Sequence, residues 1–226
     1  MGLDNRTKEK ALYEVEGLDD VLIRQLEQIN PHHRKIQFLL DIRGILTVNN
    51  IEGACVEYGC YKAETTYMAH KILGNRISKY YGIDMFEDAP PLRNSDSETN
   101  SFDVYHPFVG VPVDEVRAAF LDNPSVELVK GDLTDYKTYA HVAGPVSVAV
   151  IDCNFATALN ASISHALSCL TPVGIVFIDD YFTNMEKGGV VIEDLWNRSL
   201  KQYGKKATPF QTYPPFAKAF VVTNEV

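Results

Sequence analysis

The 226-residue chain lacks several features that mark whole classes of protein. It has no run of the roughly 18–20 apolar residues that a membrane-spanning helix needs. Its first ten residues are polar and charged, unlike a secretory signal. It has no lysine- or arginine-rich run and a formal net charge of −9, so neither nucleic acid nor a membrane surface is expected as a partner. These absences remove classes of protein without identifying a substrate.

Cysteine is sparse, and no CxxC or paired-knuckle spacing is present. The four cysteines are Cys55, Cys60, Cys153 and Cys169. Two of them fall inside or beside segments that we expect to be buried strands. We interpret them as reduced, mostly core cysteines of a cytoplasmic protein rather than as zinc ligands.

The composition that is present suits one large α/β domain, with 46% hydrophobic and 11% aromatic residues. Apolar runs predict strands at 53–57, 80–84, 126–129, 146–151 and 173–178, with helices at 63–73, 113–121, 156–170 and around 191–196. The segments 208–213 and 217–222 are expected to form a terminal antiparallel pair. This alternation predicts a Rossmann-like, seven-stranded, mostly parallel sheet with helices on both faces and a terminal antiparallel strand.

Residues 1–50 are expected to form an amino-terminal arm and helical cap before an α/β domain at 51–226. Apolar residues recur at helical spacing between 18 and 49, with a break at Pro31. Residues 87–110 are rich in Pro, Asn, Ser and Asp and predict a long loop of the kind that serves as a lid or binding loop.

Acidic residues stand at the ends of five successive predicted strands: Glu57, Asp84, Asp132, Asp152 and Asp179. In open α/β sheets, ligands bind at the carboxyl edge, where these side chains would meet. One acid is easily explained as a helix cap, but five are not. A cationic, nucleoside-bearing cofactor together with a metal ion would account for all of them.

Two of the predicted strands end in a set of acids that suits a metal. Asp179 and Asp180 follow the apolar run 173–178, and Asp152 follows 146–151. Carboxylates are hard oxygen donors, so these three could hold one Mg²⁺ or Ca²⁺ ion with water in the remaining positions.

The turn after the first predicted strand disfavours a dinucleotide. Gly59 is the only glycine between Cys55 and Leu73, where a dinucleotide-binding turn would show GxGxxG. Glu57 would repel a pyrophosphate but suits a ligand with an ammonium or sulfonium charge. Asp84 occupies the place of an acid that binds a ribose diol, and Asp132 would suit an exocyclic amine.

Five ordered segments resemble motifs of class I S-adenosylmethionine-dependent methyltransferases, and more narrowly those of the macrocin O-methyltransferase (TylF-like) family. The segments are ACVEYGCYKAET at 54–65, YGIDMFEDAP at 81–90, VELVKGDLTDY at 126–136, VIDCNF at 150–155 and PVGIVFIDDY at 172–181. The resemblance runs from about residue 53 to 196.

The resemblance implies a role for each matching position. Glu57 and Gly59 would contact the methionine moiety of S-adenosylmethionine, Asp84 the ribose and Asp132 the adenine. The full cofactor set it implies is Glu57, Gly59, Tyr61, Asp84, Met85, Asp132 and Asp152. It also implies that Asp152, Asp179 and Asp180 hold Mg²⁺ or another divalent cation. The ion would orient an acceptor hydroxyl at the sulfonium methyl and lower the pKa of that hydroxyl.

The function so implied is a Mg²⁺-dependent O-methyltransferase acting on a hydroxyl of a sugar, glycosylated metabolite or similar small polyol. The alternatives are a catechol-like acceptor, or a protein that binds S-adenosylmethionine with weak or no catalysis. Acceptor identity and oligomeric state stay open, although the amino-terminal helices could supply a homodimer surface.

One position departs from the family pattern. Many relatives have an aspartate, a candidate general base, where this chain has Asn154, and asparagine cannot take a proton at neutral pH. Asp152 and His106 are the catalytic candidates, and the other sources of a base are Tyr105, Asp103 and His165. Metal acidification alone, a more acidic acceptor or a loss of efficient turnover are further alternatives that Asn154 leaves open.

Aromatic residues offer candidate walls for the acceptor pocket. Tyr181 and Phe182 follow the predicted metal pair directly. Apolar residues of the long loop could close over the site or merely pin the loop: Phe102, Tyr105, Phe108 and Val109.

Overall fold

The computed structural model describes residues 33–89, 110–120, 123–182, 184–185, 190–213 and 217–225. Its main helices and strands follow one another along the chain as α3 (His33–Val48), β1 (Ala54–Tyr58), α4 (Glu64–Leu73), β2 (Lys79–Asp84), α5 (Val113–Ala118), β3 (Val126–Lys130), η4 (Tyr136–His141), β4 (Val146–Ile151), α6 (Ala156–Cys169), β5 (Leu170–Ile178), β6 (Asn184–Met185), β7 (Val190–Val191), α7 (Ile192–Gln202), β8 (Lys205–Tyr213) and β9 (Ala217–Asn224).

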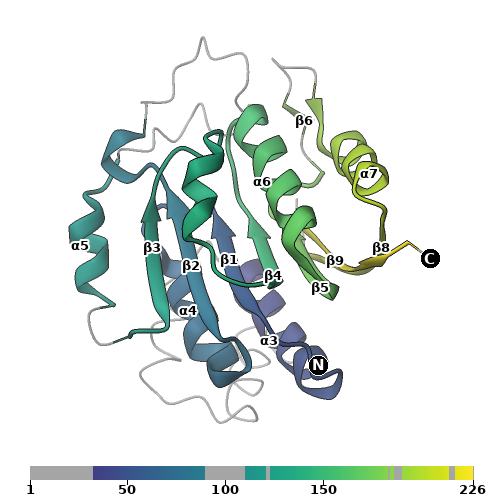
Figure 1. The fold of residues 1–226 in the computed structure, drawn as a ribbon, viewed down its shortest axis with the longest axis horizontal. Helices are drawn as coiled ribbons and strands as arrows, with labels where there is room; N and C mark the ends of the chain where they lie inside the picture. Colours follow the sequence, from purple (N-terminus) through teal and green to yellow (C-terminus); the bar gives the residue numbers. More distant parts are fainter. Residues whose placement is uncertain are drawn as a thin grey trace, which may run out of the picture.

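One seven-stranded sheet forms the centre of the molecule, in the order β3-β2-β1-β4-β5-β9-β8 (Figure 1). The pairs from β3 to β5 are parallel, and β9 is antiparallel to both β5 and β8. The predicted fold class, with its terminal antiparallel strand, is therefore confirmed. All six residues of β4 are buried between two helical layers, which explains why its run is apolar except for Ser147.

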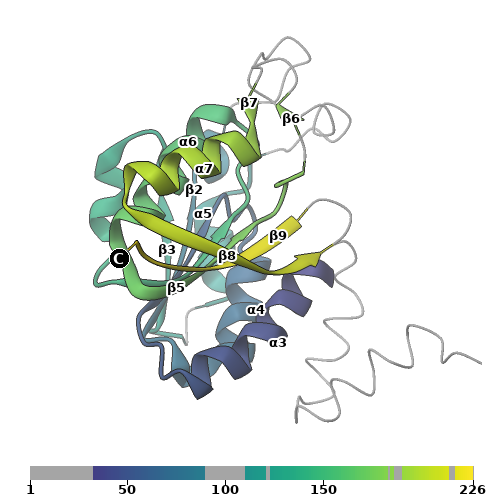
Figure 2. The ribbon, with the colours of Figure 1, turned by 90° about the vertical axis from the view of Figure 1, so that its right-hand side faces the viewer.

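Helices cover both faces of the sheet, as Figure 2 shows from the side. Helices α3 and α4 lie on one face and pack with the β-strand residues Cys55, Tyr80, Val148 and Phe177. Helices α6 and α7 lie on the other face. The described part of the expected cap, α3, is thus packed into the core of the α/β domain.

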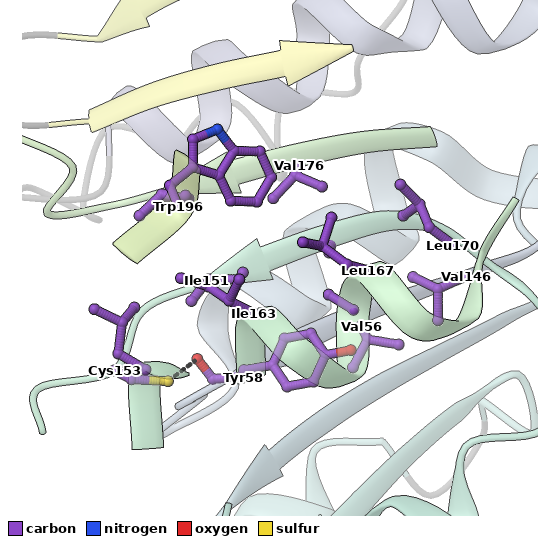
Figure 3. Packing of buried hydrophobic residues seen from close by; sticks show 14 of the residues in the cluster. Val56, Tyr58, Val146, Ile151, Cys153, Ile163, Leu167, Leu170, Val176 and Trp196 are labelled. Carbon is purple, nitrogen blue, oxygen red and sulfur yellow. Dashed lines mark hydrogen bonds between the residues drawn. The ribbon is translucent and has the colours of Figure 1, made fainter. Parts of the chain in front are cut away.

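The larger core cluster lies between the sheet and α6 and α7 (Figure 3). In Figure 3, Ile163 and Leu167 of α6 face Ile151 and Val176 of the sheet. Trp196 of α7 is 1% exposed and packs on Phe220 of β9, with ring centroids 5.1 Å apart. These contacts hold the strands in a layer that places their carboxyl ends along one edge.

The observed elements differ from the sequence predictions at several ends, among them the start of β8 at Lys205, and two of the differences have a clear cause. Strand β5 begins at Leu170 rather than at residue 173, because Leu170 pairs with Val146 at the amino end of β4. Val191, which we placed in a helix, pairs instead with Asn184 in the short β6–β7 ribbon. Tertiary pairing outweighs the local pattern at both places.

Candidate methyl-transfer site

The five predicted acids do lie at the carboxyl edge of the sheet. Glu57 is the second-last residue of β1, and Asp84 is the last residue of β2. Asp152 and Asp179 directly follow β4 and β5, and Asp132 is the second residue after β3. Because these strands are neighbours and parallel, one edge carries all five side chains.

A cavity of about 350 Å³ opens at this edge. Its lining includes six of the seven residues predicted to bind the cofactor: Gly59, Tyr61, Asp84, Met85, Asp132 and Asp152. Asn154 and Phe155, from the turn after β4, complete one wall. The volume is within the range of small-molecule and cofactor sites.

Gly59 lets the turn after β1 pass directly beside the turn after β4. Its φ angle is +82°, and an added Cβ would lie 2.1 Å from the carbonyl oxygen of Asp152. Only glycine fits such a contact without displacing backbone. The close approach brings the β1 turn and Asp152 into one cavity wall.

Asp84 shapes a second part of the wall. Its carboxylate accepts the backbone N–H of Tyr61 at 2.8 Å and that of Phe86 at 2.9 Å. Each carboxylate oxygen keeps a further lone pair that a hydroxyl could use. Asp132 is exposed, and its Oδ1 accepts both the N–H and the hydroxyl of Thr134, each at 2.8 Å.

Glu57 is the predicted cofactor residue that the structure does not place in the cavity lining. Its side chain is buried on the α4 side of the sheet and accepts the Thr66 hydroxyl at 2.5 Å. Burial raises the pKa of Glu57 to about 7, while Lys35 and Thr66 oppose the rise. Glu57 thus lies beneath the cavity, on the side of the sheet that α4 covers.

Two cations from the start of α3 reach the predicted metal carboxylates. The Arg34 guanidinium donates to both oxygens of Asp179, at 2.6 and 3.0 Å. Lys35 Nζ donates to Oδ2 of Asp152 and lies 3.8 Å from Oδ2 of Asp179. The Lys35 side chain is only 4% exposed, so its charge is buried beside these carboxylates.

This charge cluster shifts the pKa of each member. Burial raises the pKa of Asp152 to about 6, with Asp179 adding to the rise and Lys35 opposing it. Burial would also raise the pKa of Asp179, but Lys35 and Arg34 outweigh it and hold that pKa below its ordinary value. Burial lowers the pKa of Lys35, yet the nearby carboxylates prevail and raise it above its ordinary value.

The predicted three-carboxylate metal centre does not fit this arrangement. Within the described ranges, no group of three or more His, Cys, Asp or Glu side chains is placed to hold one ion. Magnesium needs several carboxylate or water oxygens in an octahedron. Here Asp152 and Asp179 direct their oxygens at Lys35 and Arg34 instead.

The candidate bases fall into three groups. Asn154 lines the cavity, where it cannot act as a base, and Asp152 lies beside it. His165 is partly buried and is not part of the cavity lining; it hydrogen-bonds the Tyr58 hydroxyl at 2.9 Å and stacks on Tyr139, and burial lowers its pKa to about 4. His106, Tyr105 and Asp103 lie outside the described residues.

The two proposed aromatic walls have different surroundings. Tyr181 is 3% exposed and packs on Phe220 at 5.1 Å, so it belongs to the core. Phe182 is 49% exposed and shares the Lys218 ammonium with Tyr181. The loop residues Phe102, Tyr105, Phe108 and Val109 lie outside the described residues.

Sequence reasoning missed Arg34 and Lys35. One signal was available, because Lys35 is spaced at helical intervals from Leu39, Ile42 and Leu46, all buried in α3. A lysine on the apolar stripe of a helix needs a buried partner. The sequence alone did not tell which carboxylates would supply it.

All four cysteines are free, and Cys55, Cys60 and Cys153 are buried. None of the helices in the described ranges has the length and apolar content of a membrane span.

Several solved structures have a similar fold. Among solved structures, the O-methyltransferase NovP superposes with a TM-score of 0.66 and 15% identity, over 84% of this chain and 80% of that chain. A Staphylococcus aureus protein provisionally described as a caffeoyl-CoA O-methyltransferase superposes with a TM-score of 0.61 and 13% identity, over 97% of this chain and 99% of that chain. The calicheamicin methyltransferase CalS11 superposes with a TM-score of 0.56 and 15% identity, over 98% of this chain and 94% of that chain. These likenesses show the fold.

A search of curated proteins finds no match. The family model described as macrocin O-methyltransferase (TylF) matches residues 32–198, which is most of the chain and includes α3 and every acid discussed above. The protein therefore belongs to the macrocin O-methyltransferase (TylF) family and is an S-adenosylmethionine-dependent O-methyltransferase.

Proposed function

We propose that the protein transfers a methyl group from S-adenosylmethionine to a hydroxyl of a sugar or of a glycosylated natural product. One observation carries the proposal: in a chain of this family, a single cavity at the carboxyl edge is lined by Gly59, Asp84, Asp132 and Asp152 together. The acceptor class is supported by the family name and by CalS11, named as a calicheamicin methyltransferase.

The cofactor would lie along the wall formed by β1, β2 and β3. Asp84 would accept hydrogen bonds from the ribose hydroxyls with the lone pairs that Tyr61 and Phe86 leave free. Met85 and Asp132 would contact the adenine, and Gly59 would let the methionine moiety approach the backbone. Glu57 would act from outside the cavity lining as a buried carboxyl that is partly ionised near neutral pH, since burial raises its pKa to about 7.

The acceptor would enter beside Asp152 and Asn154. Its hydroxyl oxygen attacks the sulfonium methyl in line, the C–S bond breaks, and S-adenosylhomocysteine leaves as the neutral thioether. Alignment and exclusion of water supply most of the rate. The hydroxyl proton passes to Asp152, whose pKa of about 6 makes it a better acceptor than an ordinary carboxylate.

No step of this proposal passes through a metal ion. The Mg²⁺ dependence that the resemblance implied requires Asp152, Asp179 and Asp180 as ligands, and two of these are paired with Lys35 and Arg34. If a divalent ion did bind there, it would polarise the acceptor oxygens.

Titration calorimetry with S-adenosylmethionine, S-adenosylhomocysteine and NAD tests the cofactor assignment. We expect the first two to bind and NAD not to bind. Asp84→Asn should weaken cofactor binding about ten- to hundredfold, since hydrogen bonds to a charged group contribute roughly 1.5–3 kcal/mol.

Asp114→Asn is the matched control, because Asp114 lies on α5 with its side chain 90% exposed. Tight NAD binding without S-adenosylmethionine binding would overturn the proposal. Equal losses in Asp84→Asn and Asp114→Asn would remove Asp84 from the cofactor site.

A further inference from the structure

A buried ammonium stands where the sequence led us to expect a divalent ion. Lys35 Nζ contacts Oδ2 of Asp152 and lies 3.8 Å from Oδ2 of Asp179. The Lys35 side chain is 4% exposed and that of Asp179 is 6% exposed, whereas Asp152 keeps 23% of its side-chain surface and lines the cavity. The ammonium therefore lies behind Asp152, out of direct reach of the acceptor.

The two carboxylates that Lys35 and Arg34 contact are paired one for one, while Asp180 acts on Arg34 and Glu57 acts on Lys35 from nearby. Asp152 and Asp179 contribute two negative charges, and Lys35 and Arg34 contribute two positive ones. The pairing with Arg34 is bidentate, which is the strongest geometry available to a carboxylate. A divalent ion entering between Asp152 and Asp179 would have to displace Lys35 or stand beside it.

Lys35 is also held in place by its helix. The same face of α3 buries Phe38, Leu39 and Ile42, each at 0% exposure, against α4 and the sheet. A cation attached to a docked helix is always present at the site, whereas a free ion must bind at its own concentration.

We propose that Lys35 is the resident cation of this methyl-transfer site and that it excludes divalent ions from Asp152 and Asp179. Lys35 is a positioning residue: it neutralises and orients Asp152, which faces the cavity. The inference concerns the same site as the proposed function and rests on it for the catalytic role of Asp152. It predicts turnover that does not need added Mg²⁺.

Electron paramagnetic resonance of Mn²⁺ tests the exclusion directly, without an activity assay. Wild-type protein treated with EDTA and dialysed should show no saturable Mn²⁺ binding. Lys35→Met has a similar length and no charge, and it should show saturable Mn²⁺ binding, at least about tenfold tighter than any weak binding by the wild type, since it frees the Asp152 carboxylate. Lys35→Arg keeps the charge and should behave like wild type.

The double variant Lys35→Met, Asp152→Asn tests where the gained Mn²⁺ binds, because it removes the carboxylate that Lys35→Met frees and should lose the Mn²⁺ signal again. Saturable Mn²⁺ binding by the wild type that disappears in Asp179→Asn would overturn the inference. This comparison of the wild type with Asp179→Asn tests the inference even if Lys35→Met fails to fold. A folded Lys35→Met variant without Mn²⁺ binding would overturn it as well.

Calorimetry with S-adenosylmethionine on the same samples separates the two proposals. If the wild type binds S-adenosylmethionine and also binds Mn²⁺ at Asp179, only the role of Lys35 fails. If it binds neither, the proposed function fails while the exclusion of divalent ions stands.

Discussion

Gly59 is the residue at which backbone geometry and ligand binding depend on each other most directly. An alanine there would bring its Cβ within 2.1 Å of the Asp152 carbonyl oxygen while the backbone holds a φ of +82°. We expect Gly59→Ala to lower the free energy of unfolding by about 3 kcal/mol or more, from strain and overpacking together. Urea denaturation measures the loss, and calorimetry should show weaker S-adenosylmethionine binding.

Gly44 provides a matched control for this substitution. It lies within α3, is exposed, and has nothing within 4 Å of an added Cβ. Gly44→Ala should raise the free energy of unfolding by roughly 0.5–1 kcal/mol, because alanine is the better helix former. Similar effects of both substitutions would show that the close approach at Asp152 relaxes easily.

At the residue scale, the sequence predicted where the acidic side chains lie but not which cations they pair with. Asp84 and Asp152 could be placed at the sheet edge because each ends an apolar run, and parallel strands bring their ends together. Lys35 could not be paired with Asp152, because 117 residues separate them and no local pattern links a helix start to a particular strand end.

At the scale of elements, α3 is the helix that carries Arg34 and Lys35, so its docking matters for the site. Phe38 anchors it, with its ring centroid 4.7 Å from that of Phe177 and 6.1 Å from that of Tyr213. We expect Phe38→Ala to lower the free energy of unfolding by roughly 3–5 kcal/mol through the lost burial and the cavity it leaves. Urea denaturation followed by circular dichroism measures the change.

Val48, at the end of the same helix, is 85% exposed and serves as the control. Val48→Ala should change the free energy of unfolding by no more than about 0.5 kcal/mol. A loss for Phe38→Ala no larger than this would mean that the aromatic cluster does not hold α3.

Most helices and strands were predictable because the spacing of apolar residues in each segment is long enough to distinguish a strand from a helix. Strand β4 is the clearest case, with the same bounds in sequence and structure. The start of β5 and the β6–β7 ribbon were not predictable, because Leu170 and Val191 join strands only through partners that the fold supplies.

For the whole molecule, the single tryptophan offers a report on cooperativity. Trp196 is buried between α7 and β9, and the strands of the central sheet connect it to the opposite edge at β3. We expect the urea transition followed by Trp196 fluorescence to coincide with that followed by far-ultraviolet circular dichroism, as for one cooperative unit. Separate midpoints would show that the α7–β9 side unfolds independently of the rest.

The sequence by itself determined the parallel sheet, the row of acids along its carboxyl edge and the family, since these follow from apolar periods and short motifs that are local in the chain. Only the tertiary structure decided what those acids do. It set Glu57 behind the cavity and Asp84 in its wall, and it brought Lys35 and Arg34 to Asp152 and Asp179. The physical reason is that a carboxylate offers the same oxygens to a metal ion and to a buried ammonium, so its partner depends on which cation the fold brings within reach.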